Sequence, residues 1–439
     1  MRRSIERCSG FCARVARALT CGVALLPLAV DAQLRIEITS GVSDPIPVAV
    51  VPFAGAGAPD LAAVVQADLE RSGRIRTLPR EQLPALPSRA ADVDLERWRA
   101  TRSDYVLVGA LRKADGDQWA ATVSLVNLAN GQTLLQETLL GTSANDRMLA
   151  HRIADLVYLK VLGIPGAFAT RIAYVSVDGR PPQQSFQLIV ADADGENARV
   201  VLQSPQPIMS PSWSPDGRWL AYVSFEAGVA AVYAQRLATG ERRKLSARAG
   251  VNGAPAWSPD GRRLLLTLSD RSGNLDLYVL DLETQQATRL TDDPAIDTEG
   301  AWAPDGRTVY FTSDRAGAPQ IYRLEIGSGA RPRRVTFGSA YNARPRVSPD
   351  GRLLAMVTLD NGAYRIGILD LQTNASRIVS AGRLDESPSF AANGATLIYA
   401  GRERGQATLA TVSTDGLIHQ RLKADRGEVR EPAFSPFLR

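Results

Sequence analysis

The sequence Pro211-Ser-Trp213-Ser-Pro-Asp216-Gly217-Arg-Trp-Leu-Ala-Tyr222 decides the fold, because the chain repeats it. The phrase returns as Pro255-Ala-Trp257-Ser-Pro-Asp260-Gly261, Trp302-Ala-Pro-Asp305-Gly306, Val347-Ser-Pro-Asp350-Gly351, Phe390-Ala-Ala-Asn393-Gly394 and Pro432-Ala-Phe434-Ser-Pro436. Its anchor positions 213, 257, 302, 347, 390 and 434 stand 43 to 45 residues apart. A repeat of about 40–45 residues built from short strands is typical of a β-propeller, with one blade per repeat.

The two ends of the repeat region complement each other. Arg171–Ser176 resembles the second strand of a repeat without its first, and Pro432–Ser435 resembles a first strand without its second. Pairing the two would close the ring and remove the free edges of an open sheet. We therefore predict a six-bladed all-β propeller over residues 171–439, closed by the C-terminal strand pairing into the first blade.

Residues 33–165 lack the repeat and alternate between strand and helix patterns. The apolar run Val48–Phe53 is typical of a buried strand. Apolar residues at positions 61, 64, 65 and 69 fall on one face of a helix. We predict a multidomain chain, with an N-terminal α/β domain at 33–165, a linker at 166–170 and the propeller after it.

Residues 1–32 have the pattern of a secretory signal peptide cleaved after Ala32. Basic residues precede an apolar run that is too short to span a bilayer well, and small residues stand at the cleavage site. The segment contains all three cysteines, five arginines and two acidic residues, so its removal changes the formal net charge from +5 to +2. We expect a soluble, exported protein without disulfides or a membrane span. Nearly balanced charge does not favour a nucleic-acid partner.

No catalytic pattern stands out. The repeated Asp suits a tight turn and the repeated Trp suits packing between blades. The hydrolase motif Gly-x-Ser-x-Gly is absent from the sequence, and His151 and His419, the two histidines, fall in different predicted domains. Asp292, Asp293 and Asp314 lack the spacing of a calcium loop. We expect no enzymatic activity, no cofactor and no metal site.

The loops that enter the first strand of each blade are the candidate recognition surface. Aligned on that strand, they place Asn252, Thr298, Asn342 and Asp385 at equivalent positions, and Glu299 and Glu386 follow two of them. In a ring these loops gather around one mouth of the central channel. The alignment therefore predicts a polar, partly acidic docking site at that mouth.

Several stretches resemble the TolB family. They are Leu34-Arg-Ile-Glu-Ile-Thr-Ser-Gly41, Pro47-Val-Ala-Val-Val-Pro-Phe53, Ser204–Gly217, Asn252–Gly261 and Leu384-Asp-Glu-Ser-Pro388, and they run in order through the mature chain. The resemblance implies a non-enzymatic periplasmic component of the Tol–Pal envelope system of Gram-negative bacteria. Such a protein binds the lipoprotein Pal with its propeller and TolA with its mature N-terminal segment, supporting outer-membrane invagination at division and outer-membrane integrity.

The resemblance also implies site residues. The family often has His where this chain has Val251. The expected Pal-binding face, with two residues added from the loop alignment, comprises Met209, Asn252, Gly253, Ala254, Thr298, Glu299, Asn342, Asp385 and Glu386. The expected TolA-binding arm spans residues 33–40 and includes Gln33, Leu34, Arg35, Ile36, Glu37 and Ile38.

Other partners in the periplasm or outer membrane stay open, as do two other function classes. One is a propeller that binds cell-wall glycan. The other is the accessory propeller of a serine peptidase, which would require a hydrolase domain that no segment here could supply.

Overall fold

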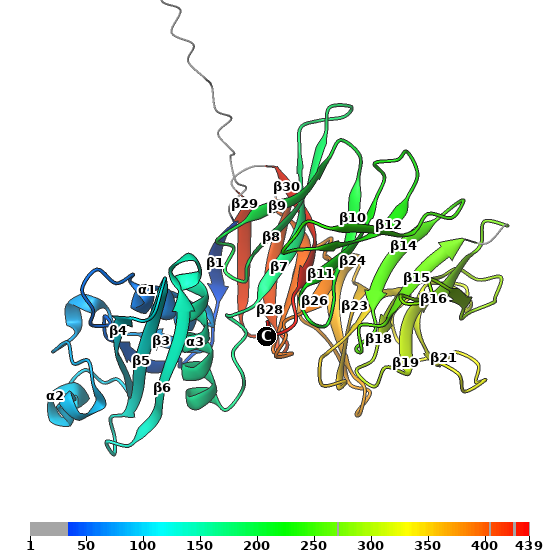
Figure 1. The fold of residues 1–439 in the computed structure, drawn as a ribbon. Helices are drawn as coiled ribbons and strands as arrows, with labels where there is room; N and C mark the ends of the chain where they lie inside the picture. The colour runs from blue at the N-terminus through cyan, green and yellow to red at the C-terminus, as the bar shows by residue number, and fades with distance from the viewer. Residues whose placement is uncertain (1–33, 270–271, 404, 425–426, 439) are drawn as a thin grey trace, which may run out of the picture. The chain divides into compact units, whose positions relative to one another are not determined.

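A computed structural model describes residues 34–269, 272–403, 405–424 and 427–438, and these belong to one compact unit. The predicted signal peptide, its cleavage site and Gln33 lie outside the described residues. The described chain contains an N-terminal α/β region followed by a β-propeller (Figure 1). Among the described helices, none has the length and apolar character needed to cross a membrane.

The α/β region is a five-stranded sheet in the order β3-β2-β4-β5-β6, packed with helices. Strand β2 runs parallel to β3 and β4, and the remaining pairs are antiparallel. Its elements are β2 (Ile46–Val50), α1 (Leu61–Arg71), β3 (Ile75–Thr77), α2 (Leu95–Arg99), β4 (Tyr105–Lys113), β5 (Gln118–Asn127), β6 (Thr133–Thr142) and α3 (Asp146–Leu162). Short 3₁₀ turns cover Arg80–Gln82, Ala90–Asp92 and Ser143–Asn145.

Helix α1 follows the apolar pattern of the sequence. Leu61, Val65 and Leu69 are buried against the sheet. Asp60 caps the helix by accepting a hydrogen bond from the backbone N–H of Ala63 at 3.1 Å. Gly73 follows the helix with a φ of +65°, a left-handed conformation that suits glycine.

The propeller has four-stranded blades, and the described residues account for six of them. Blades two to five are formed by consecutive strands, whereas the first and sixth draw on the chain ends. Blade one contains β7 (Arg171–Asp178), β8 (Ser185–Asp192), β9 (Arg199–Ser204) and β30 (Glu428–Phe434). Blades two and three contain β10 (Ile208–Trp213), β11 (Trp219–Ser224), β12 (Ala231–Arg236), β13 (Arg242–Ser246), β14 (Asn252–Trp257), β15 (Arg263–Ser269), β16 (Leu275–Asp281) and β17 (Ala287–Arg289).

Blades four and five contain β18 (Asp297–Trp302), β19 (Thr308–Ser313), β20 (Gln320–Glu325), β21 (Arg333–Arg334), β22 (Asn342–Val347), β23 (Leu353–Asp360), β24 (Ala363–Asp370) and β25 (Ser376–Ile378). Blade six contains β26 (Glu386–Phe390), β27 (Thr396–Glu403), β28 (Gln406–Ser413) and β29 (His419–Ala424). The C-terminal strand β30 pairs with β7, which confirms the predicted closure.

The repeated motif has the structural role predicted for it. The indole N–H of Trp257 donates to the carbonyl of Ser212 in the preceding blade at 3.1 Å, and Trp213 and Trp302 bond their preceding blades in the same way. Asp260 accepts bonds from the Ser258 hydroxyl and the Arg262 backbone within its own turn. The motif therefore builds turns and joins blades.

The arm adds a fifth strand to blade six. Strand β1 (Leu34–Ser40) pairs antiparallel with β29, from Leu34 opposite Ala424 to Ser40 opposite His419 (Figure 1). Leu34 is buried between blades six and one, where it packs in a cluster with Tyr174 and Ile398. The exposed outer edge of blade six is thus covered by the start of the described chain.

Candidate partner-binding site

Each inner strand bends at the same place. A register shift interrupts the pairing of every innermost strand with its neighbour. At that shift stands a residue with φ between +45° and +56°, and a proline follows it in every blade but the fourth, where Gly300 takes its place. Such bulges re-aim side chains, here around the central channel. The residues at the bulge are Ser210, Ala254, Glu299, Arg344, Ser387 and Glu431.

Buried polar residues stand two positions before the bulge. Asn252, Asn342 and Asp385 are each no more than 2% exposed. The Asn252 amide oxygen accepts bonds from the Ser246 hydroxyl and the Arg248 backbone, which fastens the loop from the preceding blade. Asp385 fastens the Ser380–Gly382 loop in the same way. These buried side chains hold the loops of the mouth in place. Their direct contact with a partner stays a prediction.

The structure corrects one position of the loop alignment. The residue equivalent to Asn252 and Asn342 is Asp297, and Thr298 lies one position further on, beside Gly253 and Ala343. Asp297 is fully buried. One guanidinium nitrogen of Arg315, Nη2, donates to both carboxylate oxygens of Asp297, at 2.7 and 2.9 Å. Strand pairing fixes this register, and the distance to the repeat anchor agrees with it, being five residues for Asp297 and four for Thr298.

Arg344 forms ion pairs with carboxylates of three other blades. Its Nε donates to Glu299 at 2.8 Å, and its Nη1 lies 3.7 Å from Glu431 and 3.8 Å from Glu386. Burial alone would lower the pKa of Arg344, but the three carboxylates outweigh burial and hold that pKa above its ordinary value. The channel thus contains a charge network that spans blades four, five, six and one.

Apolar side chains stand at or just before the start of the inner strands. We call Met209, Val251, Ile296, Tyr341 and Leu384 the rim. Each of the last four directly precedes the buried polar residue of its inner strand, and Met209 lies within β10. Met209, Val251, Ile296 and Leu384 are each 40–45% exposed, and Tyr341 packs edge-on against Tyr364 with ring centroids 5.2 Å apart. A cavity of about 440 Å³ is lined by residues of the inner strands, including Arg344 and the motif tryptophans. An exposed apolar patch around a channel is a typical docking surface.

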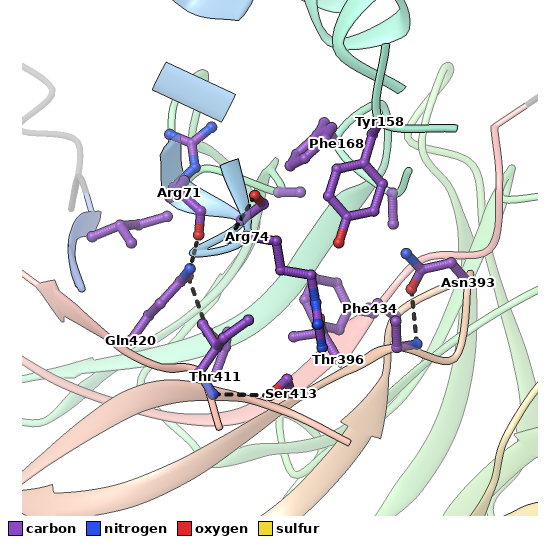
Figure 2. Close-up of a pocket in the computed structure, with 17 residues that line it drawn as sticks. Arg71, Arg74, Tyr158, Phe168, Asn393, Thr396, Thr411, Ser413, Gln420 and Phe434 are labelled. Carbon is purple, nitrogen blue, oxygen red and sulfur yellow. Dashed lines mark hydrogen bonds between the residues drawn. The ribbon is translucent and has the colours of Figure 1, made fainter. Parts of the chain in front are cut away.

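The α/β region packs against the propeller next to the arm. Arg74 forms an ion pair with Asp415, and the Gln420 side chain of β29 donates to the backbone carbonyl of Arg71. These contacts border a pocket of about 110 Å³, toward which Tyr158 and Phe168 also project (Figure 2). The strand that holds the arm is therefore also a contact of helix α1.

Comparison with known proteins identifies the family. The model of the TolB amino-terminal domain matches residues 34–134, and the model of the TolB beta propeller domain matches residues 158–438. The chain belongs to the TolB family. The Tol-Pal system protein TolB of Xanthomonas oryzae pv. oryzae strain MAFF 311018 is 45% identical over 425 residues, which cover 94% of this chain and 96% of that protein.

Other TolB proteins agree. The Tol-Pal system protein TolB of Xanthomonas campestris pv. campestris strain B100 is 45% identical over 423 residues, with the same coverage of 94% and 96%. The crystal structure of TolB from Acinetobacter baumannii is 40% identical, superposes with a TM-score of 0.85, and is covered completely by 92% of this chain.

In this TolB-family chain, sequence reasoning missed Arg344 and most of the rim. Arg344 stands 45 residues after Glu299, so the repeat spacing alone could have paired the two positions. The polar interpretation of the loops missed the rim, although an apolar residue precedes the buried polar one in four of them. Of the predicted arm, residues 34–38 lie together on the edge of blade six.

Proposed function

We propose that this TolB-family chain is a non-enzymatic scaffold of the Tol–Pal system that acts in the periplasm. In this proposal the propeller binds Pal at the channel mouth, and the arm binds TolA. The scaffold thereby supports outer-membrane invagination during division and outer-membrane integrity. The observation that carries the proposal is similarity to Tol-Pal system TolB proteins over almost the whole chain.

The Pal contact falls on the rim and the channel network in this proposal. The four strongly exposed rim side chains offer apolar area, and Glu386, whose side chain is 46% exposed, offers an accessible charge beside them. Interfaces of this kind combine an apolar centre with a few placed charges. A partner that inserts a loop into the channel would meet both.

A binding titration with purified Pal tests this assignment. Leu384→Asp, a rim substitution, should weaken Pal binding at least tenfold, because it buries an unpaired charge in the contact. The matched control is Leu140→Asp, which alters a residue of comparable exposure in β6 of the α/β region. Equal affinities for both variants would refute the rim as the contact. Retention of the protein on cell-wall sacculi without Pal would instead favour the glycan-binding alternative.

In this proposal the arm leaves β29 when TolA takes it as an added strand. Extended segments commonly bind by pairing with the edge of a partner sheet, and the arm's own backbone is already paired here. Glu37 lies opposite Arg421 in the β1–β29 pair. A disulfide between cysteines placed at these two positions would hold the arm on blade six.

The locked variant should lose TolA binding under oxidising conditions and recover it after reduction. Each single cysteine variant serves as its control. Undiminished TolA binding by the oxidised variant would contradict arm release. The same titrations, done with and without Pal, test coupling between the two sites, because any coupling has to be reciprocal.

A further inference from the structure

A buried histidine joins the α/β region to the propeller. His151 of helix α3 is fully buried, and its Nδ1 lies 2.6 Å from the Asp68 carboxylate of helix α1. Its other nitrogen, Nε2, lies 3.7 Å from Asp194, which belongs to the turn between β8 and β9 of blade one. Nε2 has no hydrogen-bond partner within the described residues. A proton on Nε2 would turn this contact into an ion pair across the junction.

The surrounding charges favour that proton. Arg71 and Arg147 already pair with Asp68 and Asp194, so a neutral His151 would leave those four charges balanced. The same guanidinium groups disfavour a metal ion between the two carboxylates. Asp155 and Asp192 also face the cluster and make its total charge negative, which favours one more positive charge on His151. The groups around His151 are Asp68 and Arg71 of α1, Arg147 and Asp155 of α3, and Asp192, Asp194 and Arg171 of blade one.

The direction of the pKa shift agrees with this geometry. Burial by itself lowers the pKa of His151, but the hydrogen bond to Asp68 and the charges of Asp68, Asp194 and Asp192 outweigh burial, so the pKa lies above its ordinary value of 6.5. A raised histidine pKa means that its stabilising contribution is complete below about pH 6.5 and is lost as the pH rises through the folded-state pKa.

The turn that carries Asp194 touches the arm. Gly195 lies so close to Leu34 that a Cβ at that glycine would be 2.8 Å from the Leu34 side chain and carbonyl. One turn further along α3, Asp155 accepts bonds from the backbone N–H groups of Phe168 and Ala169, in the segment that leads into the propeller. His151 therefore stands where helix α3, blade one and the arm come together.

We propose that the α/β region docks on the propeller with uptake of a proton at His151, so that acid tightens the junction and alkali loosens it. The protonated imidazole bridges Asp68 and Asp194. Loss of its proton leaves a buried lone pair facing a carboxylate and weakens the hold of α3 on the turn beside Leu34. This inference goes beyond the proposed function, and its test requires no partner.

The test measures the distance between the two parts of the mature chain from pH 5 to pH 9. Spin labels at exposed positions 117, on the α/β region, and 283, on blade three, report docking by pulsed electron paramagnetic resonance. The undocked population should rise with pH between the pKa of His151 in the undocked chain, where Asp68 still faces it, and its higher pKa in the docked chain, by at most about tenfold per pH unit for one proton. His151→Gln should abolish this rise, because glutamine does not titrate.

The matched control is His419→Gln, which removes the other histidine of the chain and should leave the pH dependence of the parent intact. Asp194→Asn provides a second variant that keeps His151; it should increase the undocked population near neutral pH and make its rise with pH smaller. An unchanged distance distribution from pH 5 to pH 9 would overturn the proposal. So would a parental pH dependence in both His151→Gln and Asp194→Asn.

Discussion

Replacing Arg344 by methionine should destabilise the propeller by about 3 kcal/mol. At an effective dielectric constant of about 20, a charge pair near 4 Å is worth about 4 kcal/mol before desolvation, and breaking a buried pair typically costs about 3–5 kcal/mol. The Arg344 and Glu299 side chains are 27% and 24% exposed, so solvent screens part of the interaction and the lower end applies. Methionine keeps most of the apolar stem but removes the guanidinium that pairs with carboxylates of three other blades.

Urea unfolding measures this cost, with the fluorescence of the propeller tryptophans as the probe. The midpoint should fall without a large change in slope, since the surface exposed on unfolding is nearly the same. Arg344→Lys should cost less, because the charge is kept. Arg352→Met is the matched control: the Arg352 side chain is 58% exposed and pairs with Asp370, so its loss should cost less than about 1 kcal/mol.

A double variant separates charge from packing. Adding Glu299→Gln to Arg344→Met removes one of the carboxylates that has lost its partner Arg344, and should recover part of the lost stability. The reasoning is wrong if Arg344→Met unfolds within about 0.5 kcal/mol of the parent. It is also wrong if the double variant is no more stable than Arg344→Met, because the loss would then come from packing.

Three further predictions concern single positions. Trp257→Phe should cost about 1–3 kcal/mol in urea unfolding, because it removes the bond to Ser212 and part of the contact between blades. Gly300→Ala should cost about 1–3 kcal/mol in the same assay, since a Cβ there would lie 2.3 Å from Leu265. Burial raises the pKa of Asp155 to about 6. The folded state therefore favours the protonated carboxyl, and ionisation of Asp155 as the pH rises lowers the stability of the fold. Stability measured between pH 4 and pH 7 should therefore fall by up to roughly 3 kcal/mol in the parent relative to Asp155→Asn; parallel pH profiles would contradict this.

The repeat spacing predicted the propeller because each unit carries its own turn and its own contact to the preceding blade. Asp260 and Gly261 build their turn from neighbours in sequence, so the motif is sufficient to indicate it. Closure of the ring also followed, since an unmatched strand at each end of the repeats has one natural partner. The α/β region was recognisable from the apolar face of α1 and the buried run of β2.

Features that depend on register were harder to predict. The assignment of Thr298 in place of Asp297 was wrong: strand pairing places Asp297 at this position, and the distance of five residues to the repeat anchor, shared with Asn252 and Asn342, agrees with it. The polar interpretation of the mouth missed that Asn252 and Asp385 point inward to fasten their loops while their apolar neighbours face solvent. A sequence gives the order of such residues, but strand pairing decides which of them faces outward.

The sequence by itself determined the blades and their number, because those rest on local turns and a regular period. It also indicated the family, because the resemblance extends over the unrepeated N-terminal stretches as well as the repeats. The tertiary structure decided which charges meet. Glu299, Arg344 and Glu431 come from three different blades. His151 of the α/β region contacts Asp194 of the propeller, which lies 43 residues further along the chain. The Glu299–Arg344 pair follows the repeat spacing. The His151–Asp194 contact has no such signature, because docking of the α/β region brings together residues whose distance along the chain carries no information.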